Sequence, residues 1–259
     1  MLDPLIQTPG RHPQPPGHEI AYRWFVPQGG RVIYPFSGGS VRGLVASMLG
    51  LQYIGCDLRA EQVEANNHQL DVVPDGMPAP VWICGDSVHI DEHFNGVEAD
   101  FIFSCPPYAD LEVYSDNPLD ISSMDYPAFR EAYFEIIKKT CSLLRDNRFA
   151  AFVVGEVRGK DGNYYNFVGD TIKAFMDAGL NYYNEAILVT AVGTLPIRSG
   201  RAFSVSRKLG KTHQNILVFV KGCPRKAVEA CGLVEVSDDV FSQFEVGTEA
   251  DGGEYGEQL

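Results

Sequence analysis

The sequence Phe101-Ile-Phe-Ser-Cys-Pro-Pro-Tyr108 is the stretch around which the rest of the chain is organised. Its aromatic and β-branched start predicts a buried strand, which must end at Pro106 and Pro107 because proline has no N–H for a strand ladder. The turn leaves the carbonyls of Cys105 and Pro106 without local donors, and Tyr108 adds an aromatic face beside them. Acceptors next to such a face suit a planar ring that carries an amino group, such as an adenine or cytosine taken out of its stack. An ordinary Pro-Pro strand terminator is the alternative.

Length and composition set the broad class of the protein. The chain has 259 residues, of which 45% are hydrophobic, and this is enough to bury the core of one α/β domain. No stretch approaches the roughly 18 apolar residues of a membrane span, and the start lacks the apolar run of a signal peptide. We therefore expect a cytoplasmic protein without a membrane partner. The six cysteines form no C-x-x-C pair, which favours reduced thiols over disulfides or a metal site.

The net charge of −13 is distributed unevenly along the chain. No acidic residue lies between Glu185 and Glu229, whereas residues 229–259 contain nine acids and no Lys or Arg. Prolines at positions 4, 9, 13, 15 and 16 predict an extended N-terminal arm over residues 1–17. We expect residues 18–228 to form the folded domain and residues 229–259 to form a flexible acidic tail.

Three further strand-like segments precede the central stretch. Residues 31–36 lead through Ser37-Gly-Gly39 into an amphipathic helix, residues 52–58 contain Asp57 before a second helix, and residues 81–84 precede Gly85-Asp-Ser87. In an open doubly wound sheet the carboxyl ends of the strands share one edge, so these turns should meet the Cys105 turn there. Glycines would allow a ligand close to the backbone, and Asp57 could accept ribose hydroxyls. An ordinary tight turn and a helix N-cap at Asp57 are the alternatives.

These motifs together resemble those of the S-adenosylmethionine (SAM)-dependent DNA amino-methyltransferases, the adenine-N6 and cytosine-N4 enzymes. The resemblance covers about residues 20–222 and depends on Pro35-Phe-Ser-Gly-Gly-Ser40, Gly55-Cys-Asp57, Gly85-Asp-Ser87 and Ser104-Cys-Pro-Pro-Tyr108. It implies an α/β fold with a doubly wound, seven-stranded Rossmann-like sheet whose last strand is antiparallel. The order of the motifs is similar to that in many phage and restriction-modification enzymes.

The resemblance also implies a functional site, with SAM over the glycine loop and a flipped DNA base at the central turn. The implied catalytic residues are Cys105, Pro106, Pro107 and Tyr108. The implied cofactor-binding residues are Tyr34, Pro35, Phe36, Ser37, Gly38, Gly39, Ser40, Asp57, Leu58, Asp86 and Ser87. Two of these positions depart from the family pattern. Tyr34 replaces an Asp that lies near the methionine ammonium, and Cys105 replaces an Asp, Asn or Ser that accepts a hydrogen bond from the target amino group.

Residues 190–213 are predicted to be a long loop that contacts DNA. The loop interleaves Gly and Ser with basic residues, which suits contacts to phosphate groups, and its expected DNA-binding residues are Arg198, Arg201, Arg207, Lys208 and Lys211. Their irregular spacing does not give a single helical stripe, and a solvated basic loop is the alternative. After the strand at 149–155, Glu156 and Arg158 favour a surface ion pair over contact with the base.

The sequence thus predicts methyl transfer from SAM to an exocyclic amino group in DNA. DNA is the expected partner, no metal ion is expected, and the sequence is compatible with a homodimer. Three alternatives stay open. Cys105 could act as a nucleophile that activates cytosine for methylation at carbon 5. The chain could bind SAM or DNA through a decayed site without catalysis. It could also methylate a glutamine amide of a protein, although the basic loop favours DNA.

Overall fold

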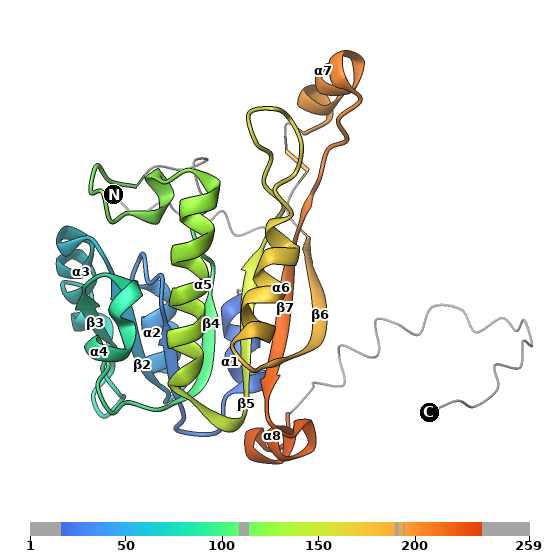
Figure 1. Ribbon diagram of the computed structural model, residues 1–259. Coiled ribbons are helices and arrows are strands. Elements are labelled where there is room, and N and C mark those ends of the chain that lie inside the picture. Colours follow the sequence, from blue (N-terminus) through green and yellow to red (C-terminus); the bar gives the residue numbers. More distant parts are fainter. Residues whose placement is uncertain (1–16, 109–113, 190–191, 194, 235–259) are drawn as a thin grey trace, which may run out of the picture.

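A single mixed sheet forms the centre of the computed structural model, which describes residues 17–108, 114–189, 192–193 and 195–234 (Figure 1). Its strand order is β3-β2-β1-β4-β5-β7-β6. The strands are β1 (Arg31–Tyr34), β2 (Gln52–Asp57), β3 (Val81–Cys84), β4 (Ala99–Ser104), β5 (Leu144–Val154), β6 (Asn181–Val189) and β7 (His213–Lys221). Neighbours among β1 to β5 are parallel, and β7 is antiparallel to both β5 and β6. The predicted seven-stranded fold with an antiparallel last strand is confirmed.

Helices cover both faces of the sheet. The helices of the described residues are α1 (Gly17–Phe25), α2 (Val41–Met48), α3 (Ala60–Asn67), α4 (Ile90–His93), α5 (Tyr126–Ser142), α6 (Phe167–Asp177), α7 (Leu195–Ser206) and α8 (Pro224–Cys231). One core lies between the sheet and α4, α5 and α6, and a second core lies between the sheet and α1, α2, α3 and α8. The chain is therefore doubly wound, as predicted.

The strand β4 shows why the central stretch organises the fold. All six of its residues are buried, because helices pack on both faces of the parallel sheet. Ile102 belongs to the core under α5, whereas Phe101 and Phe103 belong to the core under α1. Successive side chains of a strand point to opposite faces, so a continuous apolar run fills both cores. Tyr22 of α1 packs edge-on against Phe103, with 5.9 Å between the ring centroids.

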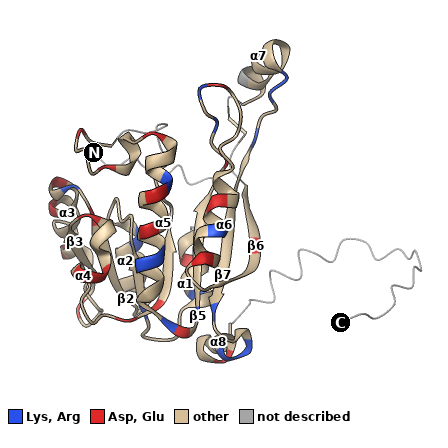
Figure 2. Cartoon of the chain, viewed as in Figure 1, with Lys and Arg blue, Asp and Glu red and all other residues tan. Residues whose placement is uncertain are grey.

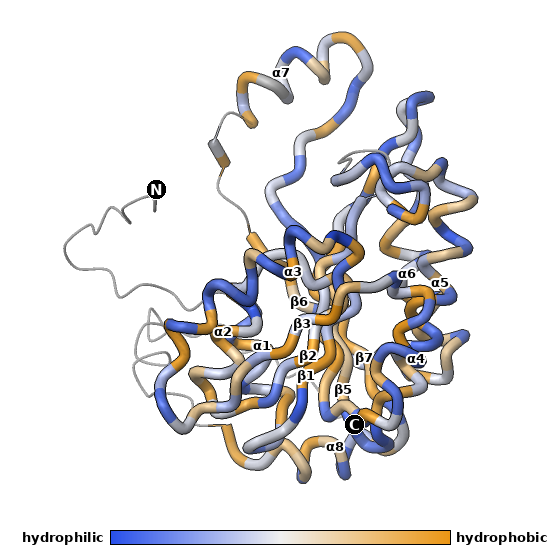
Figure 3. The backbone as a smooth tube through the Cα atoms, turned by 90° about the vertical axis from the view of Figure 1, so that its left-hand side faces the viewer, coloured by the Kyte–Doolittle hydropathy of each residue, from blue (hydrophilic) through white to orange (hydrophobic). Residues whose placement is uncertain are grey.

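The structure differs from the sequence prediction between the last two strands. Residues 190–213 were expected to be a loop throughout, but Leu195–Ser206 form the helix α7, with Pro196 in its first turn. Ile197 and Val205 remain 75% and 85% exposed. Because α7 buries no face against the core, its apolar residues do not recur at helical spacing in the sequence. The prediction of a loop over residues 195–206 was therefore wrong. α7 lies beyond the carboxyl edge of the sheet, away from the main layers (Figures 1 and 3).

The expected domain limits can be compared only in part. Helix α8 continues past the expected boundary at residue 228 and ends at Cys231. Residues 1–16 of the predicted arm and residues 235–259 of the predicted acidic tail lie outside the described residues. No helix in the described part of the chain is long and apolar enough to cross a membrane.

Candidate active site

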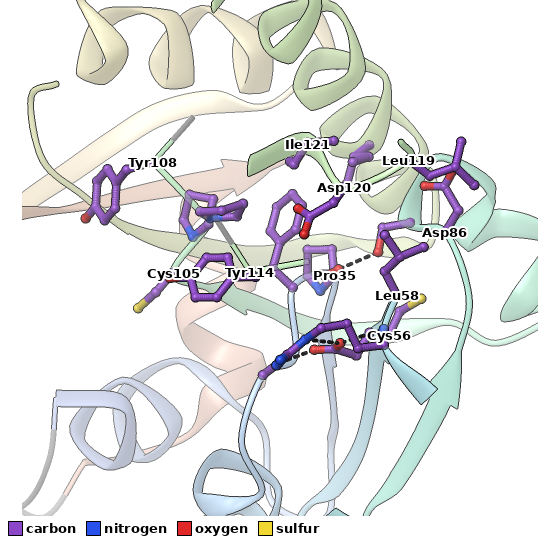
Figure 4. Close-up of a pocket in the computed structure, with 18 of the residues that line it drawn as sticks. Pro35, Cys56, Leu58, Asp86, Cys105, Tyr108, Tyr114, Leu119, Asp120 and Ile121 are labelled. Atoms are coloured by element: carbon purple, nitrogen blue, oxygen red, sulfur yellow. Dashed lines mark hydrogen bonds and ion pairs between the residues drawn. The ribbon is translucent and has the colours of Figure 1, made fainter. Parts of the chain in front are cut away.

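A cavity of about 430 Å³ lies at the carboxyl ends of β1, β2, β3 and β4 (Figure 4). Its volume lies within the range of about 300–1,000 Å³ for small-ligand sites. Seven of the predicted cofactor-binding residues line it: Pro35, Phe36, Gly38, Asp57, Leu58, Asp86 and Ser87. The four predicted catalytic residues, Cys105, Pro106, Pro107 and Tyr108, line it as well. The sheet therefore brings together residues that are more than fifty positions apart in the sequence.

Asp57 shapes the glycine loop at the tip of β1. Its Oδ2 accepts a hydrogen bond from the Gly38 N–H at 2.8 Å, and its Oδ1 accepts one from the Arg59 N–H at 3.0 Å. Gly38 has a φ of +56°, a conformation that favours glycine. Burial raises the pKa of Asp57, against the lowering effect of these two hydrogen bonds. Each oxygen keeps a further lone pair, so the carboxylate can still accept a ligand hydroxyl.

Asp86 and Ser87 form the neighbouring part of the wall, after β3. Asp86 Oδ1 accepts a hydrogen bond from the Val88 N–H at 2.9 Å, which caps a short 3₁₀ helix at Ser87–His89. Ser87 Oγ donates to the Pro35 carbonyl at 2.5 Å and so ties the tip of β3 to the tip of β1. No hydrogen bond of the described residues uses Asp86 Oδ2, and this oxygen can accept a bond from a ligand.

The segment before α5 closes the same side of the cavity. Asp120 caps a 3₁₀ helix at Ile121–Ser123, where its Oδ1 accepts from Ser122 and its Oδ2 accepts from Ser115 Oγ at 2.7 Å. Burial alone would raise the pKa of Asp120, but these hydrogen bonds outweigh it and hold the pKa below its usual range. Asp120 therefore adds a negative charge to the cavity.

The Cys105-Pro-Pro-Tyr108 turn, the predicted catalytic turn, is held by hydrogen bonds to Tyr34 and from Gln214. The Cys105 N–H donates to Tyr34 Oη at 3.0 Å, and Gln214 Nε2 of β7 donates to Tyr108 Oη at 2.6 Å. The Tyr108 ring also meets Phe167 of α6 edge-on, with 5.8 Å between the centroids. The carbonyls of Cys105 and Pro106 accept no hydrogen bond from the described residues. The turn thus has two carbonyl acceptors without a donor among the described residues and an aromatic ring whose position is fixed.

Four of the predicted cofactor-binding residues do not line the cavity: Tyr34, Ser37, Gly39 and Ser40. Tyr34 is fully buried, and its hydroxyl accepts the hydrogen bond from the Cys105 N–H. Ser37 is also fully buried, where its hydroxyl pairs with Tyr53 Oη at 3.1 Å. Gly39 and Ser40 lead from the loop into α2. Gly39 and Ser40 are therefore proposed to shape the glycine loop.

Five residues that line the cavity were not identified from the sequence: Arg42, Cys56, Arg59, Ile136 and Gln214. Four more, Tyr114, Leu119, Asp120 and Ile121, belong to the acidic segment 110–125, which the sequence predicts as a loop at the border of the base pocket without singling out these residues. Arg42 could have been noticed as a basic residue in the first turn after the glycine loop. The Asp120-Ile-Ser122 sequence is a capping pattern that marks a fixed carboxylate. Gln214 had no local signal, since only the sheet places β7 beside the catalytic turn.

The predicted DNA-binding residues lie outside the cavity, on α7 and on the chain that leads back to β7 (Figure 2). Arg201, Arg207 and Lys211 are exposed, and Lys208 is partly buried. Arg198 lies within α7, and its side chain is outside the described structure.

A hairpin after β5, at residues 157–165, contacts this basic segment. Arg158 Cζ lies 3.8 Å from the centroid of the Tyr164 ring, and Lys211 Nζ lies 5.3 Å from the same centroid. The predicted ion pair between Glu156 and Arg158 is wrong. Glu156 instead accepts a hydrogen bond from the Phe167 N–H at the start of α6, and Arg158 donates to the Gly162 carbonyl.

No family model and no curated protein matches the sequence. Among solved structures, a SAM-dependent methyltransferase from Methanosarcina mazei is 10% identical over 78% of this chain and 97% of that one, with a TM-score of 0.50. The cyclopropane synthase MmaA2 from Mycobacterium tuberculosis is 10% identical over 79% and 82%, with a TM-score of 0.52. TrmN from Thermus thermophilus is 15% identical over 74% of this chain, with a TM-score of 0.48, and this chain spans 44% of its length. The chain has the fold of SAM-dependent methyltransferases.

Proposed function

We propose that this protein transfers a methyl group from SAM to the exocyclic amino group of an adenine or cytosine in DNA. One observation carries the proposal. A single cavity joins the glycine loop, Asp57 and Asp86 to the Cys105-Pro-Pro-Tyr108 turn, so a cofactor and a planar amino-bearing ring can meet within it. A glycine loop followed by acids, or a Pro-Pro turn, is common in α/β proteins when it occurs alone. Their presence in one cavity is what supports methyl transfer.

The residues at the tips of β1, β2 and β3 fit SAM. Gly38 permits close approach of a ligand, and the nearest heavy atom to a Cβ built on it is 3.9 Å away. Asp57 and Asp86 retain acceptor capacity for ribose hydroxyls and for the adenine amino group. When bound, SAM supplies an electrophilic methyl group on a sulfonium.

The catalytic turn would act by positioning the target base. The free carbonyls of Cys105 and Pro106 accept the hydrogens of the amino group and draw them out of the plane of the ring. This localises the nitrogen lone pair, which is otherwise delocalised into the ring. Tyr108, held by Gln214 and Phe167, offers its ring for stacking on the base. Orientation of this kind supplies a large part of the lowering of the barrier, so no general base with a shifted pKa is required.

The basic surface beside the turn supports a nucleic-acid substrate. Arg158 of the hairpin and Lys211 before β7 converge on Tyr164 from different parts of the chain. Gln214, three residues after Lys211, bonds to Tyr108, so this surface borders the catalytic turn. The chain between Glu185 and Glu229 contributes no acid to this surface, and the hairpin contributes Asp161, which interacts with Lys208. Lys and Arg contacts to phosphates would hold a strand in register without reading its bases.

The proposal is tested by identifying the product. The purified protein is incubated with mixed-sequence DNA and methyl-labelled SAM, the DNA is digested, and the labelled nucleoside is identified by mass spectrometry. We expect N6-methyladenine or N4-methylcytosine, and a Tyr108→Ala variant serves as a control against contaminating enzymes. A parallel incubation with RNA of matched composition determines whether DNA or RNA is the substrate.

Other products would contradict the proposal in different ways. Formation of 5-methylcytosine would show that Cys105 acts as a nucleophile. Label found in RNA alone would identify RNA as the substrate, and label found in protein would indicate an amide target. SAM binding without label in any of these would indicate a non-catalytic binding protein.

A further inference from the structure

An arginine that the sequence motifs do not include lies at the glycine-loop wall of the cavity. Arg42 is in the first turn of α2, and its side chain is partly buried and lines the cavity. Its Nη1 lies 3.9 Å from the position that a Cβ on Gly38 would occupy. Its Cζ lies 5.2 Å from the centroid of the Tyr34 ring. The guanidinium is therefore placed between the glycine loop and the tyrosine that supports the catalytic turn.

Arg42 differs from the other partly buried arginines because the described residues give its guanidinium neither a carboxylate nor any other hydrogen-bond partner, whereas Arg31 and Arg158 donate to oxygen acceptors. Arg148 pairs with Asp100 at 3.0 Å, and Arg59 lies 3.9 Å from Asp57. Arg42 makes no ion pair and no hydrogen bond among the described residues, and its contact is the face of the Tyr34 ring. A guanidinium stays protonated, and a partly buried charge without a partner is costly. An anionic group of a ligand would satisfy it.

The order of the strand tips places this cation at one end of the cavity. The sheet order β3-β2-β1-β4 sets Asp86, Asp57, the glycine loop and Cys105 in a row. Figure 4 shows Asp86 and Leu119 on one side of the cavity and Cys105 and Tyr108 on the other. Acceptors for ribose and adenine therefore lie toward β3, and Arg42 lies toward the catalytic turn, where the amino-acid end of SAM must be if its methyl group is to reach the base.

We infer that Arg42 binds the carboxylate of the methionine part of SAM, an assignment that builds on the proposed function. That carboxylate is the anionic group of SAM, and a guanidinium matches it with two parallel N–H donors. The neighbouring Tyr34 carries no charge and is occupied by the Cys105 N–H, so it does not serve as an ionic partner. Arg42 thus provides a charged contact for the amino-acid end at a site where the chain has tyrosine in place of an acid.

The test compares SAM with decarboxylated SAM, which lacks this carboxylate but keeps the sulfonium and the amine. Calorimetry without DNA gives the affinity of the 259-residue chain for each ligand, so no methyl transfer is involved. The wild-type protein should prefer SAM about ten- to a hundred-fold, the range for a charge-assisted hydrogen bond. Arg42→Gln should lose SAM affinity by a similar factor, keep its affinity for decarboxylated SAM, and so lose the preference. Arg42→Lys, which keeps a point charge, should retain part of it.

Arg59→Gln is the matched control, because Arg59 lines the cavity near Asp57. It should change the affinity for both ligands by the same factor and leave the preference intact. If wild type binds both ligands equally, or if Arg42→Gln weakens both equally, the assignment is wrong while the proposed function stands. If wild type binds neither ligand, both are overturned. If Arg42→Gln leaves SAM affinity unchanged and lowers the DNA affinity measured separately by fluorescence anisotropy, Arg42 is assigned to a phosphate and the inference is overturned.

Discussion

The two halves of the carboxyl edge of the sheet are built differently. At the β1–β3 half, short turns are fixed by hydrogen bonds such as Gly38 to Asp57 and Ser87 to Pro35, and the residues line the cavity. At the β5–β7 half, the hairpin at 157–165 and the α7 segment extend beyond the sheet (Figure 2). Arg158 of the hairpin and Lys211, between α7 and β7, both contact the Tyr164 ring. The first half depends on the packed sheet, whereas the second is exposed. Changes in one half should therefore leave the other intact.

Removing the basic residues of the exposed half should have the largest effect. In the variant Arg207→Ala, Lys208→Ala, Lys211→Ala, DNA affinity should fall at physiological salt while SAM affinity is unchanged. The slope of log affinity against log salt should become shallower by up to about 2.7, because each phosphate contact on duplex DNA contributes about 0.9. Fluorescence anisotropy over a salt series measures the slope.

The matched control removes three exposed basic residues from elsewhere, with Arg23→Ala, Lys138→Ala and Lys173→Ala. It changes the net charge by the same amount and should alter the slope much less. An equal slope in the two triple variants would mean that DNA responds to overall charge rather than to this surface.

The reverse experiment changes a residue of the β1–β3 half. Asp57→Ala should weaken SAM binding by about 1 to 3 kcal/mol, since it removes a ligand acceptor and leaves the Gly38 N–H without its partner. The salt dependence of DNA binding should stay as in wild type. Calorimetry compares this variant with Asp75→Ala, an exposed acid outside the cavity. Unchanged SAM affinity in Asp57→Ala would remove this residue from the cofactor site.

The same contrast explains how much the sequence could predict. The strands and their turns were predictable, because Phe101 to Phe103 and the glycine and Asp turns carry local signals. Helix α7 was missed because its apolar residues are exposed and show no period. Gln214 was missed because its bond to Tyr108 joins residues 106 positions apart. Sequence patterns report burial and turns, whereas contacts between distant elements need the fold.

Tyr34 lies at the border of the two halves, and its hydroxyl should have a moderate effect on stability. Tyr34→Phe keeps the ring under Arg42 but removes the acceptor of the Cys105 N–H. The free energy of unfolding should fall by about 1 kcal/mol, the usual value for one hydrogen bond. Urea denaturation measures it. Tyr22→Phe is the control, because the buried Tyr22 hydroxyl has no partner among the described residues, and this change should not destabilise the protein.

The smallest effect is expected at Cys105, in the middle of the edge. If the target is an amino group, the turn acts through the carbonyls of Cys105 and Pro106, so Cys105→Ser keeps the shape and adds a better acceptor. Activity should be retained or rise modestly, and the product should be methylated on nitrogen. If carbon 5 of cytosine is the target, the variant loses the thiolate that must add to the ring, and a serine alkoxide forms far less readily near neutral pH. Product analysis by mass spectrometry on wild type and variant decides between the two mechanisms. If the variant is inactive and the wild type forms 5-methylcytosine, the turn acts in nucleophilic catalysis and not by positioning an amino group.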